Sequence, residues 1–339
     1  MKISIRDFAP IKEADIALDG LTVIAGDNDT GKSTVGKLVF SLIKAANRSR
    51  KTNAAATQQR VLLRTHLNLI FGRDDRAGTI SLFATTDDRT ELDAEIGPNG
   101  DITRFEVSDN LFFSDAILIE TPVVWQLFDT FQGITAHNSD PSYTDTASRI
   151  KFPYSLFNVY QCLNGSVPGN LVDSKSSLSR IECLAHGRLV FSEGKPNFRR
   201  NDKEFPIQSV ATGIQALAIL QRLLELGLAV NHRLLILDEP EVHMHPKWQL
   251  EYAKLLVSMV DELGMSVLMT THSPVFVEAM EFVGKKKLGE KCHFYLSERM
   301  AEGGASDPVV LRDVTEDLDP VYEKLAHPLM QLSLFQGDA

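Results

Sequence analysis

A glycine-rich segment between a buried strand and an amphipathic helix is the feature that most restricts how this chain can fold. Residues 21–25 are almost continuously apolar, which predicts a strand buried on both faces. They lead directly into Gly26–Thr34, which matches the pattern G-x-x-x-x-G-K-[ST] over its full length. Apolar side chains then recur at helical spacing, at Val35, Leu38, Val39, Leu42 and Ile43. This order of strand, loop and helix predicts an α/β fold with a phosphate-binding loop.

The chemistry of phosphate binding explains the spacing within this loop. Gly26 and Gly31 allow the backbone to curl so that its N–H groups point at phosphate oxygens, and the helix N-terminus adds partial positive charge. Lys32 can then reach the β- and γ-phosphates, and Ser33 offers its hydroxyl to Mg²⁺. The pattern therefore predicts ATP and Mg²⁺ as cofactors. The loop residues expected to bind them are Gly26, Asn28, Asp29, Thr30, Gly31, Lys32, Ser33 and Thr34.

A second segment, Leu234–Pro246, carries two adjacent carboxylates at the end of a strand. Its first four residues are aliphatic, which predicts another buried strand, and Pro240 ends the strand by removing an N–H donor. Carboxylates beside a buried strand are costly unless they meet a cation or a reacting water. We therefore expect Asp238 to face a metal ion and Glu239 to face a nucleophile. On these residues alone, two polar side chains at the mouth of a turn remain an alternative.

Two more predicted buried strands end in polar side chains. Residues 116–119 run into Glu120, and residues 266–271 run into His272. In doubly wound sheets, ligands bind beyond the carboxyl ends of the parallel strands. We therefore expect His272 to have a functional role rather than a purely structural one.

Two further features are ambiguous on the residues alone. Thr212 and Gly213 precede a helical pattern, and they form either an anion-binding helix start or an ordinary helix cap. His243 and His245 alternate and could chelate a transition metal, but Pro240 has already ended the strand and no cysteine joins the set. We therefore favour an interpretation without a transition metal.

Composition indicates a cytoplasmic protein without a membrane segment. The apolar fraction of 43% and the charged fraction of 24% are ordinary for a globular protein. No apolar run reaches the roughly 18 residues needed to cross a bilayer, and the charged, alternating N-terminus is not a signal or transit peptide. Cys162, Cys183 and Cys292 are scattered, which favours a reducing compartment. The net charge of −10 argues against a surface broadly coated for nucleic acid.

We expect residues 1–339 to form a single domain. Within it, residues 41–75 and 123–185 have loose patterns that favour helical or flexible insertions, and residues 76–115 favour short antiparallel strands. Nucleic acid stays open as a partner, because the first insertion is basic, although such a run is more often a solvated face. Its basic residues are Arg48, Arg50, Lys51, Arg60 and Arg64.

The order of these motifs resembles the core of the ABC-type ATPases. Gly26–Thr34 corresponds to Walker A, residues 211–215 to the signature, Leu235–Glu239 to Walker B with its glutamate, and Thr271–Ser273 to the switch histidine. The N-terminal Ile-Arg-Asp-Phe and the run Asp-Glu-Pro-Glu-x-His-x-His-Pro are more similar to the SMC/RecF-like branch than to transporter subunits. Within that branch, the chain resembles the AAA-type ATPases of overcoming-lysogenization-defect (OLD) and Septu-like anti-phage systems.

The resemblance implies an α/β fold of the ABC-ATPase head type, a P-loop NTPase with a mostly parallel core sheet, an N-terminal antiparallel β subdomain and a helical insertion. It implies catalytic roles for Glu239 and His272, and metal contacts from Ser33, Asp238 and Glu120. It also implies that a second, head-to-tail subunit completes each site with its signature, so that ATP holds together a homodimer or a higher oligomer. The signature residues that would bind this nucleotide are Thr212, Gly213 and Gln215.

The resemblance further implies an ATPase, and Ile214 in place of the usual signature glycine suggests slow turnover. Few residues follow His272, so we expect no OLD-type nuclease domain and a separately encoded effector, a nuclease or a toxin, in anti-phage defence. A RecF/SMC-like ATPase of DNA repair or maintenance is the alternative. A transporter's nucleotide-binding subunit is the third class, and it ranks lowest because of the N-terminal pattern. As a family feature, the run His243–Pro246 would lie near the dimer face and could couple the two ATP sites.

Overall fold

A twisted sheet forms the centre of the computed structural model, which describes residues 1–72, 77–83, 90–97, 99–139, 152–166, 174–242, 244–300 and 307–326. In these ranges, eleven strands join in the order β6-β5-β4-β1-β2-β14-β13-β3-β12-β11-β7. Their bounds are β1 Lys2–Phe8, β2 Ile11–Ala17, β3 Leu21–Gly26, β4 Gly78–Phe83, β5 Thr90–Ile96, β6 Ile102–Val107, β7 Asp115–Ile119, β11 Arg233–Asp238, β12 Ser266–Thr271, β13 Cys292–Arg299 and β14 Val309–Asp313.

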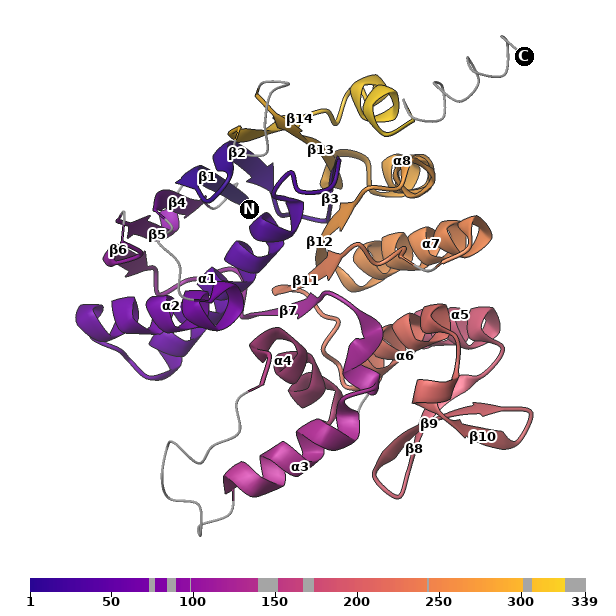
Figure 1. Ribbon diagram of the computed structural model, residues 1–339. Coiled ribbons are helices and arrows are strands. Elements are labelled where there is room, and N and C mark those ends of the chain that lie inside the picture. Colours follow the sequence, from indigo (N-terminus) through magenta and orange to yellow (C-terminus); the bar gives the residue numbers. More distant parts are fainter. Residues whose placement is uncertain are drawn as a thin grey trace, which may run out of the picture.

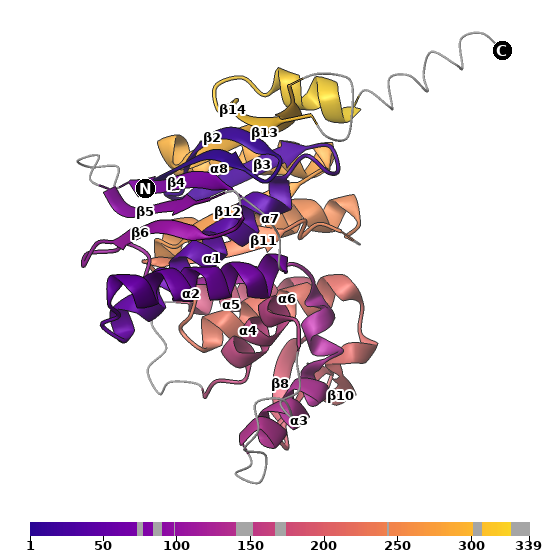
Figure 2. The same cartoon turned by 60° about the vertical axis from the view of Figure 1, so that its left-hand side comes forward.

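The sheet has a parallel half and an antiparallel half. Strands β13, β3, β12, β11 and β7 pair in parallel. Strands β2, β1, β4, β5 and β6 form an antiparallel meander, visible side by side in Figure 2, and a parallel pair of β2 with β14 joins it to the rest. The antiparallel strands are therefore a continuation of the core sheet. Strand β2 was not among the predicted strands.

Helices cover both faces of this sheet (Figure 1). In Figure 1, α1 and α2 lie on one side of the central strands, and α6, α7 and α8 lie on the other. A separate three-stranded sheet, β8 to β10, follows α5 in the chain. The bounds are α1 Lys32–Lys51, α2 Ala56–Phe71, α3 Phe128–Ser139, α4 Tyr154–Leu163, α5 Lys175–Ala185, β8 Arg188–Ser192, β9 Lys195–Arg200, β10 Lys203–Pro206, α6 Thr212–Glu225, α7 Pro246–Leu263 and α8 Pro274–Leu288.

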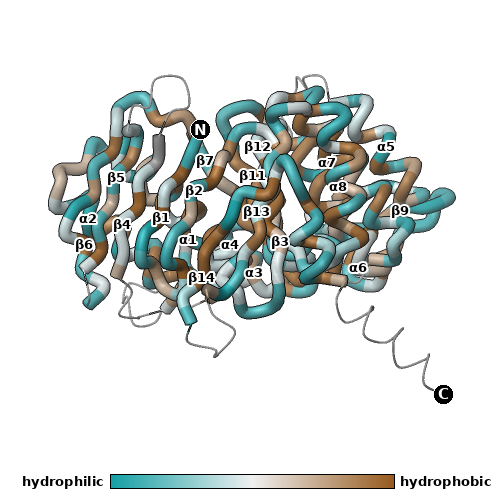
Figure 3. Tube along the Cα trace, turned by 90° about the horizontal axis from the view of Figure 1, so that it is seen from above, coloured by the Kyte–Doolittle hydropathy of each residue, from teal (hydrophilic) through white to brown (hydrophobic). Residues whose placement is uncertain are grey.

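Alternating side chains of the central strands fill two separate cores. In β11, Leu234 and Ile236 belong to the cluster beneath α1, whereas Leu235 and Leu237 belong to the cluster beneath α6, α7 and α8. Successive side chains of a strand point to opposite faces, so a strand covered on both sides must be apolar at every position. In Figure 3, the central strands are coloured mostly as hydrophobic. This explains the four consecutive aliphatic residues at this point in the sequence.

The helical and strand segments expected between residues 41 and 185 can be compared with the described ranges. Residues 41–51 lie in α1 and residues 56–71 in α2, residues 78–107 contain β4 to β6, and α3, α4 and α5 fall between residues 123 and 185. Parts of the predicted insertions, at residues 73–76, 140–151 and 167–173, lie outside the described residues. None of the helices in the described ranges is long and apolar enough to cross a membrane.

Candidate active site

The topology brings the polar strand ends of the sequence together at one edge of the sheet. Thr271 pairs with Ala25, Asp238 with Thr270, and Leu237 with Ile119. The loops that follow β3, β12, β11 and β7 are therefore neighbours, and they carry the glycine-rich loop, His272, Glu239 and Glu120. Because the strands are parallel, all four carboxyl ends meet at the same edge.

The glycine-rich loop has the backbone conformation that its glycines predicted. Gly26 has φ 153° and Gly31 has φ 78°, and Gly31 precedes the first residue of α1. A Cβ added at Gly26 would overlap the carbonyl oxygen of Ser297 on the neighbouring strand β13. Asp29 is also left-handed, with φ 60°. Only glycine fits at Gly26, because β13 approaches too closely for any side chain.

The Lys32 side chain lies across the loop. Its Nζ donates to the carbonyl oxygens of Gly26, at 2.9 Å, and Asp27, at 2.6 Å, and lies 4.0 Å from Oε1 of Glu239. The residue is 4% exposed. Burial lowers the pKa of Lys32, and the carboxylates of Glu239 and Asp238 partly oppose this shift. A cation is therefore held beside the loop carbonyls, next to the carboxylate pair.

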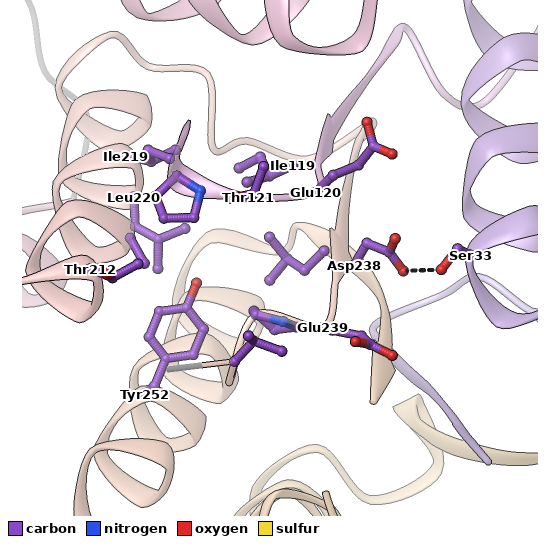
Figure 4. Close-up of a pocket in the computed structure, with 15 residues that line it drawn as sticks. Ser33, Ile119, Glu120, Thr121, Thr212, Ile219, Leu220, Asp238, Glu239 and Tyr252 are labelled. Carbon is purple, nitrogen blue, oxygen red and sulfur yellow. Dashed lines mark hydrogen bonds between the residues drawn. The ribbon is translucent and has the colours of Figure 1, made fainter. Parts of the chain in front are cut away.

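One carboxylate oxygen of Asp238, at the end of β11, accepts hydrogen bonds from α1 and from β12. The Ser33 hydroxyl donates to Oδ1 of Asp238 at 2.8 Å (Figure 4), and the Thr270 hydroxyl donates to the same oxygen at 2.6 Å. A serine hydroxyl and a carboxylate are oxygen ligands of the kind that Mg²⁺ prefers. Residues Ser33 and Asp238 thus fit the donor set expected for the metal. Thr270 was not predicted, although its hydroxyl interrupts an apolar strand beside β11.

Glu239 and His272 are in direct contact. Nδ1 of His272 lies 3.1 Å from Oε1 of Glu239, and both side chains are partly exposed. The Glu239 backbone is left-handed, with φ 48°, and its N–H donates to the carbonyl and hydroxyl oxygens of Thr270. Such a conformation costs about 1 kcal/mol or more for a residue with a side chain, and it is commonest at functional sites. The two predicted catalytic residues therefore form one pair.

Glu120 lies near this group, but its charge is already paired. Lys37 of α1 approaches its carboxylate at 2.7 Å, and Figure 4 shows this carboxylate pointing away from Asp238. Its role as a metal ligand stays a prediction, and a metal ion would compete with Lys37 for the Glu120 carboxylate.

A cavity of about 290 Å³ opens beside the carboxylates. Ser33, Asp238 and Glu239 line one side, and Thr212 of α6 lines the other, as Figure 4 shows. The rest of its wall is mostly apolar and comes from β7, β11, α6, α7 and the segments that follow β7 and β11. The cavity thus connects the polar strand ends with the start of α6.

The three predicted signature residues lie in different surroundings. Thr212 is the first residue of α6, and Gly213 faces the Trp248 ring. Gln215 is buried, its side-chain amide donates to the carbonyls of Val210 and Gln208, and its own carbonyl accepts from Trp125. Of the three, Gln215 is the least suited to bind a nucleotide, because its side chain already stabilises the turn before α6. All three assignments stay predictions.

Three contacts to the phosphate loop come from the last third of the chain and were not predicted. Arg299 donates to the carbonyl and the carboxylate of Asp29, at 2.6 and 2.9 Å. Ser297 donates to the carbonyl of Thr30, and Lys324 lies 3.7 Å from the carboxylate of Asp27. Sequence patterns could not indicate these contacts, because those of Ser297 and Arg299 depend on the non-local pairing of β13 with β3, and that of Lys324 depends on the packing of the helix at residues 319–326.

The histidine pair after Pro240 can be followed only in part. His245 precedes α7, and its Nδ1 accepts a hydrogen bond from the N–H of Lys247. His243 lies outside the described residues. Within those residues, no group of three or more His, Cys, Asp or Glu side chains could hold a metal ion.

Comparisons with known proteins agree with this architecture. Residues 192–278 match the family described as "AAA domain, putative AbiEii toxin, Type IV TA system". Over 95 residues, the chain is 28% identical to the OLD nuclease of Thermus scotoductus, a match that covers 27% of this chain and 18% of that relative. The solved structure of an SMC head bound to the C-winged helix domain of ScpA is similar, with a TM-score of 0.53, 13% identity, and cover of 95% of this chain and 98% of that one.

The family match contains the part of the site that follows residue 192, and the glycine-rich loop lies outside it. Residues 192–278 include the start of α6, Asp238, Glu239 and His272, whereas the fold likeness extends over almost the whole chain. The expected fold, a P-loop NTPase of α/β type, is confirmed. The chain thus has the fold of an SMC-type ATPase head, and it resembles the ABC-type ATPases of the SMC/RecF-like branch and the OLD-like ATPases.

Proposed function

We propose that this chain binds ATP with Mg²⁺ at Gly26–Thr34 and hydrolyses it. The observation that carries the proposal is the meeting of four motifs at one edge of the sheet, where Lys32 and Ser33 of the loop lie against Asp238 and Glu239. A turn without a ligand does not require a buried lysine beside one carboxylate and a hydroxyl bonded to the next, and burying such groups is costly.

Residues of the loop and of β11 would bind different parts of the Mg²⁺–ATP complex. The loop N–H groups, the start of α1 and Lys32 would bind the phosphates, and Lys32 would exchange its carbonyl partners for phosphate oxygens. Ser33 and Asp238 would hold Mg²⁺, which when bound neutralises phosphate charge, and Glu120 is the third candidate ligand. The ion pair with Lys37 would have to open for Glu120 to take part.

Glu239 and His272 would act on the water. In hydrolysis, a water oxygen forms a bond to the γ-phosphorus while the bond from that phosphorus to the β–γ bridging oxygen breaks, and ADP leaves. Glu239 would accept the hydrogen bond of this water and take its proton, since its carboxylate stands at the mouth of the site. His272, 3.1 Å from that carboxylate, would hold it in place and contact the γ-phosphate.

A second copy of the chain would complete each site. Glu239 and His272 remain partly exposed, with side-chain exposures of 29% and 43%, so this side of the site can be covered by another surface. In a head-to-tail dimer the partner's α6 start, with Thr212 and Gly213, would supply N–H groups to the γ-phosphate. ATP would then hold the two subunits together, and hydrolysis would release them.

The output of this cycle would lie on a separately encoded effector, a nuclease or a toxin, in anti-phage defence. One relative and one family support this class of effector, because the relative is a nuclease and the matched family is described as a putative toxin. The second candidate is a DNA repair or maintenance ATPase, which the likeness to an SMC head supports. Both candidates leave nucleic acid open as a partner.

Phosphate release from ATP by the purified chain tests the enzymatic proposal. We expect slow, Mg²⁺-dependent hydrolysis that Glu239→Gln reduces by about a hundredfold or more, as is usual when a general base is lost. Nucleotide affinity should be retained in this variant, because Glu239 does not touch the loop carbonyls. Hydrolysis that persists unchanged in Glu239→Gln would contradict the proposal.

A further inference from the structure

A second glutamate, Glu241, is buried two residues beyond the proposed base. Its side chain is 3% exposed, and burial raises the pKa of its carboxyl above the ordinary value. Oε1 accepts a hydrogen bond from the hydroxyl of Thr271. Oε2 is buried and has no hydrogen-bond partner in the described part of the chain. A carboxyl in this setting is costly, and an apolar side chain of similar size would fill the same space at less cost.

The partner of this carboxyl lies directly before His272. Thr271 is the last residue of β12, and its hydroxyl also accepts the N–H of Ser273 at 3.0 Å. The Thr271 hydroxyl therefore bonds across the backbone of His272, from the residue before it to the residue after it. Glu241 thus fixes the loop that carries the histidine.

A second set of hydrogen bonds joins the loops that follow β11 and β12. The Ser273 hydroxyl donates to Oε1 of Gln249 at 3.1 Å, and Nε2 of Gln249 donates to the carbonyl of Met244 at 3.1 Å. Glu241 and Met244 follow β11, whereas Thr271 ends β12 and Ser273 comes two residues later. The two sets of hydrogen bonds therefore reach the residues on either side of His272, Thr271 through Glu241 and Ser273 through Gln249.

These hydrogen bonds hold His272 in contact with Glu239. The Glu239 backbone is left-handed, and such strain persists only where the surroundings hold it in place. We infer that Glu241 is a positioning residue of the ATPase site, which acts through Thr271 to hold His272 against Glu239. This inference rests on the proposed ATPase function and extends it, because it assigns Glu241 to the hydrolytic step and not to nucleotide binding.

Substitutions at both ends of the hydrogen bond test this assignment. Glu241→Ala and Thr271→Val remove it, and we expect kcat to fall by about tenfold or more while KM and ATP affinity change by less than about threefold. Glu241→Gln and Thr271→Ser keep a partner for the bond, and we expect kcat within about threefold of the wild type. If Glu241→Ala does not fold, Thr271→Val and Glu241→Gln carry the same test.

A matched control separates positioning from stability. Glu91 is also a buried glutamate, 4% exposed, and its carboxylate accepts the N–H of Phe112 at 2.7 Å, far from the site in the antiparallel half of the sheet. Glu91→Ala should lower the unfolding temperature and leave kcat unchanged. Equal loss of kcat in Glu91→Ala and Glu241→Ala would overturn the inference.

A double-mutant cycle shows whether Glu241 acts through His272. If it does, Glu241→Ala should reduce kcat in the wild type but not further in a His272→Ala background. Additive losses, a Glu241→Ala kcat equal to the wild type, or a Glu241→Gln variant as slow as Glu241→Ala would overturn the inference. Absence of any hydrolysis by the wild type would instead remove the proposed function, so the two failures are distinguishable.

Discussion

The hydroxyl of Ser33 donates a 2.8 Å hydrogen bond to Oδ1 of Asp238, a residue 205 positions later in the chain. This bond joins the phosphate-binding loop to the strand that carries the two carboxylates. It also places a hydroxyl oxygen and a carboxylate oxygen side by side, which is the arrangement expected of two ligands to one small cation. The proposed metal site depends on this pair.

Substitution of Asp238 should therefore weaken the dependence on the metal. In Asp238→Asn, the amide oxygen keeps the shape but loses the charge, so the Mg²⁺ concentration for half-maximal hydrolysis should rise by about tenfold or more, equal to about 1.4 kcal/mol. A Mg²⁺ titration of phosphate release measures this change. Asp93→Asn, which removes a carboxylate paired with Arg104 in the antiparallel half of the sheet, is the control and should leave the titration unchanged.

Loss of Lys32 should strongly weaken nucleotide binding. Lys32→Ala removes the buried cation beside the loop carbonyls, and we expect ATP affinity to fall by about a hundredfold. Calorimetric titration with ATP and Mg²⁺ measures the affinity. Lys12→Ala, which breaks an exposed ion pair with Asp7, should bind ATP as the wild type does. An unchanged affinity in Lys32→Ala would refute the assignment of the loop.

A negative charge at the start of α6 should block the proposed dimer but not the binding of ATP to one subunit. Gly213→Asp would oppose the γ-phosphate of a nucleotide held by a second copy, so ATP-driven association and hydrolysis should both be lost. Gly213→Ala is the matched control, because a Cβ there would meet the Trp248 ring at 3.4 Å and could be accommodated. Sedimentation with ATP distinguishes the two variants. Equal association in both would mean that α6 does not face the nucleotide.

Stability should depend on pH through a histidine remote from the site. Burial lowers the pKa of His66 to about 4, with help from Lys44 and Arg48. Because its folded pKa lies below the unfolded value, the stability that it contributes is present above about pH 6.5 and is lost as the pH falls toward 4. The free energy of unfolding should drop by roughly 2 kcal/mol across this range. Denaturant melts of His66→Phe should show a smaller drop, and an identical drop would contradict the assignment to His66.

The sequence predicts those parts of the fold that depend on residues close together in the chain. The strand at Leu234–Leu237 is a continuous apolar run and the one at Leu21–Ala25 is interrupted only by Thr22, and burial on both faces of the sheet requires such runs. The phosphate loop is a contiguous motif, and the chemistry of phosphate binding explains the positions of its glycines, its lysine and its serine. For the same reason, the strand ends at Asp238 and His272 could be assigned before their neighbours were known.

The contacts that escaped prediction join distant parts of the chain. Arg299 and Lys324 touch the phosphate loop only because β13 pairs with β3 and the short helix at residues 319–326 packs nearby. The burial of Glu241 and of Gln215 also depends on tertiary packing. The local sequence around each of them does not distinguish a buried polar residue from an exposed one. Antiparallel strand β2 was missed because its apolar side chains, at Ile11, Ala14 and Ile16, alternate irregularly with charged residues.

In the proposed cycle, ATP holds two copies of this chain together and hydrolysis separates them. The molar mass of Glu239→Gln by light scattering, with and without ATP and Mg²⁺, tests this cycle. This variant should bind ATP without hydrolysing it, so we predict a monomer mass without nucleotide and about twice that mass with ATP. If the variant binds ATP at saturation and stays monomeric, ATP does not hold two copies together.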